Sequence, residues 1–378
     1  MMRPLALALA LAIALGIPAA GCAPAISDAY LNTFAAGQRA YHAGRYEEAA
    51  RAFADAAGRA ERVKDRDEAR LMEARSYQRA SRWEPARAAY QRLIADSPKG
   101  PRSARAEFEL AELAIEHGDA EAGWAMLRAA VRRHASHGMA RRVLRSLVQR
   151  EEDRGGPAAA VAWLEREAPQ LRGTEIEQAA SYELGLALER SGDREGAIRT
   201  LVAAARARPY PFGAHADNAL FEAARIASEA SRPEEAIRYL REMLAPRERA
   251  ETGSYERPLF DDAQLEIAEL YRDALKDRAA ARREFHRLYA DHPASLMRDD
   301  ALWQEALLWR EDAKQDETCA AARRLSRELP ESRYARCVHH LCPSLPALKQ
   351  PCAGYIERQL RGDGEAGKAG ETGEAGEE

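Results

Sequence analysis

The chain has 378 residues, of which 46% are hydrophobic and 31% are charged, and its formal net charge is −4 at pH 7. The acidic excess lies in residues 362–378, which hold six acids and one lysine, so the remainder of the chain is close to neutral. Composition therefore gives no electrostatic case for a nucleic-acid partner, which would require a strongly basic face.

Residues 1–21 have the composition of an export leader. Arg3 supplies a short positive start, and residues 5–17 are apolar but form a run too short to span a bilayer well. The segment therefore predicts a targeting signal that is removed from the mature protein.

The leader ends at Gly21-Cys22, which resembles the lipobox of bacterial lipoproteins, although Ala19 stands where that pattern usually has Leu. The resemblance implies that Cys22 becomes a lipidated N-terminus, and Ala23 in place of Asp implies sorting to the outer membrane. Three acyl chains would anchor the protein firmly, because each buried CH₂ contributes about 0.8 kcal/mol. The alternative is ordinary cleavage after Ala25, at an A-x-A site.

From residue 27 onward, one pattern recurs every 37 residues and predicts pairs of short helices. Each anchor residue is followed by a turn-forming residue after seven positions, a small residue after 12 and a large apolar residue after 16. The five anchors are Gly37, Ala74, Ala111, Val148 and Gly185. Two short amphipathic helices cannot bury both apolar faces alone, so such units must stack on one another.

The spacing resembles that of a tetratricopeptide (TPR) repeat, W-x2-L-G-x2-Y followed by A-x3-F and P. In residues 181–209, Gly185, Ala197 and Pro209 match this pattern, whereas the Trp is absent and Leu replaces both aromatics. The resemblance implies an all-α, TPR-like α-solenoid of about eight helix-turn-helix repeats over residues 27–330. The alternative is an irregular, alanine-rich helical bundle.

Three further helix pairs are expected after residue 208. The sixth is centred on Ala224, the seventh contains Phe285, and the eighth covers residues 299–329. The polar residues 246–258 lengthen the interval between the sixth and seventh pairs and predict a surface loop.

Several polar residues are expected to start helices. Asp119 and Asp193 can cap second helices of their pairs, and Thr174 with Glu177 three positions later has the spacing of a capping box. In linkers such as residues 291–295, Pro ends one helix and Ser can cap the next. These P-x-S linkers resemble those of periplasmic TPR lipoproteins and coordinators of the BamD and YbgF/CpoB type.

The C-terminal region divides into a cap and a tail. Residues 331–361 contain three of the cysteines and predict two short helices that close the open end of the solenoid. Residues 362–378 contain no apolar residue larger than Ala, so they cannot form a core and are expected to be disordered.

Apart from Cys22, four cysteines cluster near this end: Cys319, Cys337, Cys342 and Cys352. An even number in an exported protein predicts two disulfides. If Cys337 and Cys342 share a helix, they are too far apart to pair, which favours Cys319–Cys337 with Cys342–Cys352. The rival interpretation is a metal site that adds His339 and His340, but the spacing in C-V-H-H-L-C matches no zinc module, so we expect no metal.

The first helix of each pair would line the concave side of the solenoid. Aromatic and polar residues at fixed positions around four anchors are therefore candidates for a partner-binding groove, because rings supply apolar area and polar groups fix orientation. They are Phe34, Gln38, Phe108, Glu112, Tyr182, Leu186, Phe221 and Arg225. The alternative is that these rings pack between adjacent first helices.

Catalytic motifs are absent from the sequence: it contains no G-x-S-x-G, H-E-x-x-H or G-x-x-x-x-G-K-[ST]. We therefore predict a non-enzymatic scaffold or adaptor without a cofactor or small-molecule substrate. It would be a lipoprotein of the bacterial cell envelope, at the periplasmic face of the outer membrane, that holds envelope proteins or peptides during assembly or coordination. The alternatives are a pilotin-like accessory lipoprotein of secretion or motility and, less favoured, an envelope enzyme.

Overall fold

The computed structural model describes residues 26–248 and 258–361. The leader with Cys22, part of the expected loop at 246–258 and the acidic segment 362–378 lie outside the described residues. The described part is built from helices and contains no strand, and it divides into a first unit that ends at Val143 and a second that begins at Leu144.

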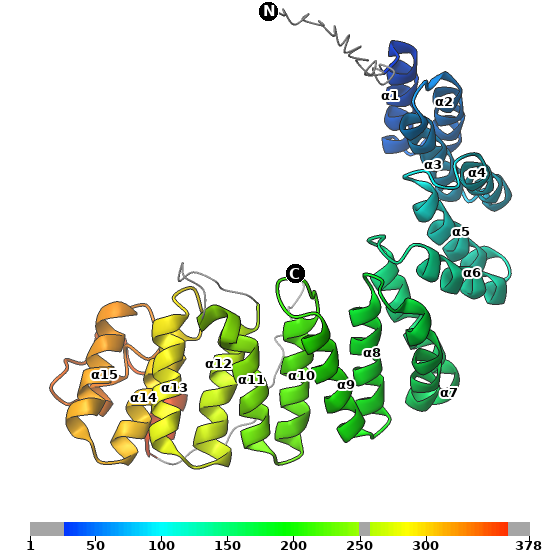
Figure 1. Cartoon of the computed structure of the whole chain (residues 1–378). Helices are drawn as coiled ribbons and strands as arrows, with labels where there is room; N and C mark the ends of the chain where they lie inside the picture. The colour runs from blue at the N-terminus through cyan, green and yellow to red at the C-terminus, as the bar shows by residue number, and fades with distance from the viewer. Residues whose placement is uncertain (1–25, 249–257, 362–378) are drawn as a thin grey trace, which may run out of the picture. The chain divides into compact units, whose positions relative to one another are not determined.

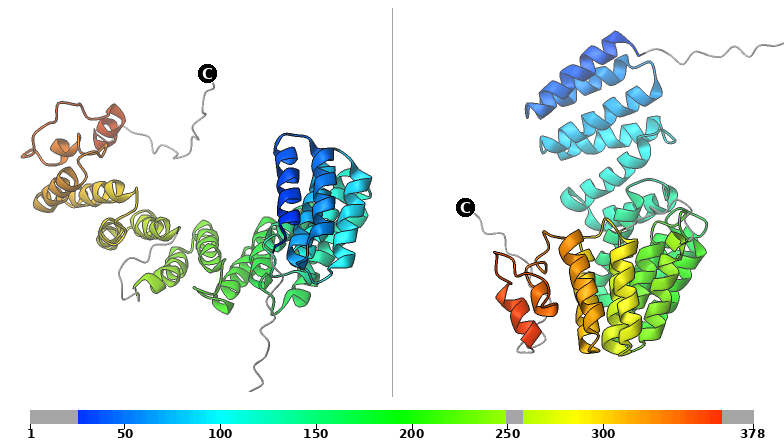
Figure 2. Two further views of the ribbon diagram at one scale, coloured as in Figure 1. Left: turned by 90° about the horizontal axis from the view of Figure 1, so that it is seen from above. Right: turned by 90° about the vertical axis from the view of Figure 1, so that its left-hand side faces the viewer.

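The first unit contains three helix pairs, which stack one on the next (Figure 2, right). Its helices are α1 (Asp28–His42), α2 (Tyr46–Arg59), α3 (Val63–Arg79), α4 (Trp83–Asp96), α5 (Ser103–His117) and α6 (Ala120–Arg133). Each helix packs against the helices next to it in sequence, which is the contact pattern of a stack of repeats.

Helix α7 (Ala140–Leu171) begins at the end of the first unit and supplies the fourth pair. Its backbone leaves the helical conformation at Gly155 and Gly156, where Gly156 has a φ of 74° that other residues rarely adopt. Pro157 then starts the second half, a position at which proline needs no hydrogen-bonded N–H. The continuous element is therefore two helices joined by a tight turn.

The second unit continues with four pairs, whose helices α8 to α15 stand side by side (Figure 1). They are α8 (Glu177–Arg190), α9 (Arg194–Ala207), α10 (Ala216–Glu229), α11 (Pro233–Glu248), α12 (Phe260–Glu269) with the π-helical turn η1 (Leu270–Ala274), α13 (Arg278–Asp291), α14 (Arg298–Glu311) and α15 (Gln315–Glu328). With the three pairs of the first unit and the halves of α7, this confirms the predicted α-solenoid of about eight pairs.

The periodic positions form the core. All the anchors and the residues 12 and 16 positions after them are buried, from Gly37, Ala49 and Phe53 in the first pair to Ala224, Ala236 and Leu240 in the sixth. The anchor lies against the large residue of the same pair. A Cβ added to Gly185 would lie 2.5 Å from Cγ of Leu201, and one added to Gly37 would lie 2.8 Å from the Phe53 ring. Small anchors therefore let the two helices of a pair approach closely.

The turn-forming position is also used as predicted in several pairs. Ser81 and Ser231 adopt φ values of 56° and 59°, and Gly192 adopts 94°, all in the left-handed region that ends a helix. In each pair this conformation lets the chain reverse within two or three residues.

The helix caps agree with the sequence in part. Asp119 accepts a hydrogen bond from the N–H of Ala122 (3.0 Å), and Asp193 accepts one from Gly196 (2.8 Å), so both predicted caps are confirmed. The expected capping box at Thr174 is wrong, because α8 begins at Glu177. The carboxylate of Glu177 accepts from the N–H of Gly173 instead (2.8 Å).

The end of the described chain is a cap with two short helices, α16 (Val338–Leu341) and α17 (Gly354–Arg361). The disulfide Cys319–Cys342 links the cap to α15, and Cys337–Cys352 links two segments within the cap. The predicted pairing of Cys319 with Cys337 and of Cys342 with Cys352 is therefore wrong. Cys337 and Cys342 flank α16 at its opposite ends. Its C-terminal end lies against α15, where Gln315 donates to the carbonyl of Leu341 (2.9 Å), and its N-terminal end lies against the segment before α17.

None of the helices in residues 26–248 and 258–361 is both long enough and apolar enough to cross a bilayer.

Replacing Gly185 by alanine should lower stability, because the new Cβ forces Leu201 to move and overpacking of this kind costs about 1–3 kcal/mol. Gly58 in α2 is the matched control, since a Cβ there meets nothing within 4 Å. Gly58→Ala should instead raise stability by about 0.5–1 kcal/mol through helix propensity. Thermal and urea unfolding of both variants would test this, and equal stabilisation by the two would contradict the proposed close approach.

Candidate partner-binding surface

The predicted groove residues all lie on first helices of their pairs. Phe34 and Gln38 are on α1, Phe108 and Glu112 on α5, Tyr182 and Leu186 on α8, and Phe221 and Arg225 on α10. Their exposure and contacts differ, and these differences decide which of them could meet a partner.

Phe108 belongs to the core, so its assignment to a binding groove is wrong. Its side chain is fully buried, and its ring lies against the rings of His137 (centroids 5.5 Å apart) and His134 (6.2 Å). The turn between α6 and α7 carries these two imidazoles over the ring, and no periodicity of the helices predicts where that turn lies.

Phe34 is half-buried between two other rings. Its ring centroid is 5.3 Å from that of Tyr30 on the same helix and 5.1 Å from that of Phe53 on α2. These ring contacts lie within the first pair, whereas the alternative interpretation placed the rings between adjacent first helices. Gln38, one turn later on α1, is exposed.

Tyr182 and Phe221 remain half-buried in the second unit and pack against the hydrophobic cluster formed by α9 to α12. The Tyr182 ring stacks on the imidazole of His215 at a centroid distance of 5.0 Å. Burial, with smaller effects of Glu222 and Glu183, raises the pKa of Tyr182 to about 12. The hydroxyl is therefore neutral at physiological pH, and a partner role for this ring and for half-buried Leu186 stays a prediction.

The two charged candidates are joined to neighbouring first helices by ion pairs. Glu112 lies 2.9 Å from Arg142, and Arg225 on α10 lies 2.6 Å from Glu189 on α8 while also contacting Glu222 and Glu229 on its own helix. Burial would lower the pKa of Arg225, but its hydrogen bonds to these three carboxylates outweigh it and raise the pKa. These charges are therefore already partnered within the chain.

The same kind of link recurs between other first helices. Arg75 on α3 pairs with Glu109 on α5, and in the second unit Arg145 and Glu152 of α7 pair with Glu183 (3.2 Å) and Arg190 (2.8 Å) of α8. The sequence did not lead to a prediction of these links between helices. The signal it did offer is opposite charges that recur about one repeat apart, at separations of 34 and 38 residues.

Glu109 is the most connected of these carboxylates. It accepts hydrogen bonds from Arg75 (2.9 Å), from Arg105 (2.8 Å) and from the hydroxyl of Tyr90 (3.0 Å). Burial acts to raise the pKa of Glu109, but these donors favour the ionised form more strongly, and its pKa lies below the ordinary value. A partly buried carboxylate with three partners fixes α3, α4 and α5 relative to one another.

A surface groove lies between α4, α5 and α6 in the first unit, and we call it the α4–α6 groove. Its volume is about 320 Å³, and its floor is formed by the apolar side chains of Ile94, Leu110 and Met126. At one rim Glu107 pairs with Arg133 (2.7 Å). The groove continues past this rim into a hollow of about 540 Å³ beside Pro98, Lys99 and Gly100.

A second groove lies between α8 and α9, with a volume of about 670 Å³. Small side chains, Ala203 and Ala207, keep it open, and Glu177 and Arg199 supply opposite charges to its walls. Buried Gln178 holds its end by donating to the carbonyls of Ala204 (3.0 Å) and Arg208 (2.8 Å) and accepting from the N–H of His215 (3.0 Å). The sequence did not single out either groove, because each is lined by residues of separate helices.

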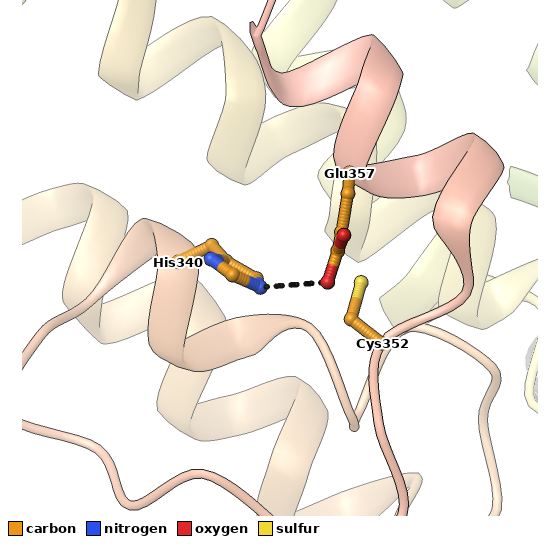
Figure 3. A group of neighbouring side chains, drawn as sticks. All are labelled: His340, Cys352 and Glu357. Carbon is orange, nitrogen blue, oxygen red and sulfur yellow. Dashed lines mark ion pairs between the residues drawn. The ribbon is translucent and has the colours of Figure 1, made fainter.

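Possible metal ligands gather at one place in the described residues. His340, Cys352 and Glu357 offer donor atoms that all lie within 4.8 Å of one another (Figure 3), but the sulfur of Cys352 is bonded to Cys337. In this oxidised form the group therefore offers only an imidazole and a carboxylate.

Glu109→Gln should lower stability at neutral pH by about 2 kcal/mol, because charged hydrogen bonds contribute about 1.5–3 kcal/mol. The folded-state pKa of Glu109 is depressed, so its contribution is complete above the unfolded value of about 4.3 and is lost as pH falls through the folded value. Urea unfolding at pH 7 and near pH 3 should therefore show a difference between wild type and variant that shrinks in acid.

Glu116→Gln is the control for this experiment, since Glu116 is an exposed residue of the same helix. The free energy of unfolding of this variant should stay within about 0.5 kcal/mol of that of the wild type. A Glu109→Gln deficit that is independent of pH would show that the carboxylate does not act through its charge.

Comparison with known proteins gives matches to two tetratricopeptide repeat models. The first covers residues 34–101, 71–138 and 182–254, and the second covers residues 262–295. Among curated proteins, no sequence matches this chain.

The chain is also similar to solved structures, at low sequence identity. The C-terminal part of a TPR repeat-containing protein from Cytophaga hutchinsonii is 16% identical, with a TM-score of 0.42 over 71% of this chain and 99% of that one. Pseudomonas aeruginosa pilF is 18% identical, with a TM-score of 0.35 over 61% and 93%. PilW, a type IV pilus biogenesis factor, is 15% identical, with a TM-score of 0.30 over 73% and 99%.

The matched repeats coincide with the helix pairs described above and together cover more than half of the chain. The matches to the first model begin three residues before the anchors Gly37, Ala74 and Gly185. The chain therefore belongs to the tetratricopeptide repeat family.

Proposed function

We propose that this chain is a non-enzymatic scaffold or adaptor of the bacterial cell envelope that holds partner proteins on its TPR repeats. Stacked helical repeats are typically protein-interaction modules, since they present extended surfaces rather than a closed active site.

The α4–α6 groove is the observation on which the interaction role rests most directly. Ile94, Leu110 and Met126 offer an apolar floor, and the Glu107–Arg133 pair offers both a donor and an acceptor at the rim. Apolar floors with a few polar groups at the edge are typical of sites that receive a side chain or a short segment of a partner. Methionine in such a floor adapts to differently shaped side chains.

The ion pairs between first helices support a partner that is recognised by shape and apolar contact. Arg75, Arg145 and Arg225 are each engaged by a carboxylate of a neighbouring helix. A phosphate backbone would have to displace these carboxylates, so the arrangement favours a protein or peptide over a nucleic acid.

Two features support an exported location. The described cysteines form two disulfides, and such bonds persist mainly in oxidising compartments. The leader that ends at Gly21-Cys22 resembles a lipobox. We propose that Cys22 carries the lipid anchor and that the chain faces the periplasm from the outer membrane.

Ala129→Glu should block the α4–α6 groove and weaken partner binding at least about tenfold, because a charged side chain would enter an apolar site. The partner would first be identified by crosslinking in the native envelope, and its affinity for purified wild type and variant would then be measured. Partners from outer-membrane assembly or cell-envelope coordination would support the proposed role, whereas pilus or secretion components would favour the pilotin-like alternative.

Ala125→Glu is the matched control, since Ala125 is exposed one turn earlier on α6 and does not line the groove. The free energies of unfolding of both variants should lie within about 0.5 kcal/mol of that of the wild type, because substitutions of exposed residues usually have small effects. Equal affinity of the two variants for the partner would rule out the groove as the contact.

Cys22→Ser should release the protein from membranes, because the substitution removes the sulfur that would carry the lipid. Membrane and soluble fractions of cells expressing each form would be compared by immunoblotting. An unmodified N-terminus at Ile26 in the wild type, measured by mass spectrometry, would contradict the lipid anchor.

A further inference from the structure

The C-terminal cap brings together three side chains of metal-binding types that come from separate segments of the chain. His340 comes from α16, Glu357 from α17, and Cys352 from the segment that precedes α17, and they point toward one another (Figure 3). His340 is exposed and Glu357 is partly exposed, so an ion could reach the group from solvent.

The spacing of these atoms fits a small tetrahedral site better than a direct ion pair. Nε2 of His340 lies 3.6 Å from Oε1 of Glu357, which is longer than an ordinary hydrogen bond. Zinc bonds of about 2.0–2.3 Å place tetrahedral ligands about 3.3–3.8 Å apart. The imidazole and the carboxylate already have this separation, and Cys352 Sγ, within 4.8 Å of both, needs to move by only about 1 Å.

The fourth donor is Cys337, whose sulfur is bonded to that of Cys352. Cys337 is the N-cap residue of α16, and His340 follows three residues later within this one-turn helix. The same short helix therefore positions both side chains. We propose that, when the Cys337–Cys352 disulfide is reduced, Cys337, His340, Cys352 and Glu357 bind one zinc ion.

The reaction balances with a thiol reductant. Two thiols transfer two electrons and two protons to the Cys337–Cys352 bond, which breaks to give two cysteine thiols while the reductant forms its own disulfide. Zn²⁺ then replaces the two thiol protons, and His340 and Glu357 complete four-coordination. The segment before α17 thus stays linked to α16 in both states, by a disulfide when oxidised and by a metal when reduced.

From the sequence, a metal site was set aside because the spacing in C-V-H-H-L-C matches no zinc module. Cys342 is instead joined to Cys319 on α15 and does not belong to the group of donor atoms. The partners of His340 are Cys352 and Glu357, which only the return of the chain through α17 brings close.

Cobalt binding to the reduced full-length chain tests the proposal, because Co²⁺ reports thiolate ligation and tetrahedral geometry in its absorption spectrum. The chain would be reduced with a phosphine, freed of metal with a chelator, and titrated with Co²⁺ and then Zn²⁺. We expect one equivalent of Co²⁺ with thiolate charge-transfer bands, displaced by Zn²⁺, and no such bands from the oxidised chain. Absence of the bands from the reduced chain would overturn the proposal.

His340→Ala and Glu357→Gln should each lower the affinity of the reduced chain for Zn²⁺ at least about tenfold. His339→Ala removes the adjacent imidazole, whose ring lies 4.0 Å from that of His340, and should leave the affinity within about threefold of wild type. Unchanged affinity in His340→Ala would overturn the assignment.

The double variant Cys319→Ser with Cys342→Ser separates this site from the other pair of thiols. It should retain one equivalent of Zn²⁺ after reduction, with helix content checked by circular dichroism. Loss of zinc binding by a folded double variant would instead assign the metal to Cys319 and Cys342 and would contradict the proposed ligand set.

Discussion

The close approach of the two helices within each pair is the constraint on which the rest of the structure depends. Gly185 lies against Leu201, and Gly37 lies against the ring of Phe53, with no room for a further carbon. Because neither helix can bury its apolar face alone, this contact and the stacking of pairs form the core within each unit. The same geometry leaves the opposite faces of the helices free to carry charge and grooves.

The charges on these faces mostly hold the stack together. Glu109 joins α3, α4 and α5, and Arg225 joins α8 to α10, so residues that seem available in sequence are already occupied. Individual exposed ion pairs contribute little, but partly buried carboxylates with several donors contribute more. Partner recognition is therefore better assigned to apolar hollows such as the α4–α6 groove than to the charged first-helix positions.

The sequence placed the candidate site residues on the correct helices but did not predict which of them are exposed. Position relative to the anchor specifies which helix face a side chain occupies, and Tyr182 and Phe221 do lie half-buried on such faces. It does not specify what covers that face, and the turn carrying His134 and His137 buries Phe108 completely. Groove floors were missed because Ile94, Leu110 and Met126 come from three different helices.

By itself the sequence determined the helical class, the number of pairs, their anchors and the caps at Asp119 and Asp193, because these follow from periodicity and from contacts a few residues apart. Only the tertiary structure decided the disulfide pairing and the grouping of His340 with Cys352 and Glu357. Those contacts depend on how the short α16 lies between α15 and α17. The cap has no repeat to set its path, so its pairings depend on packing between segments distant in sequence.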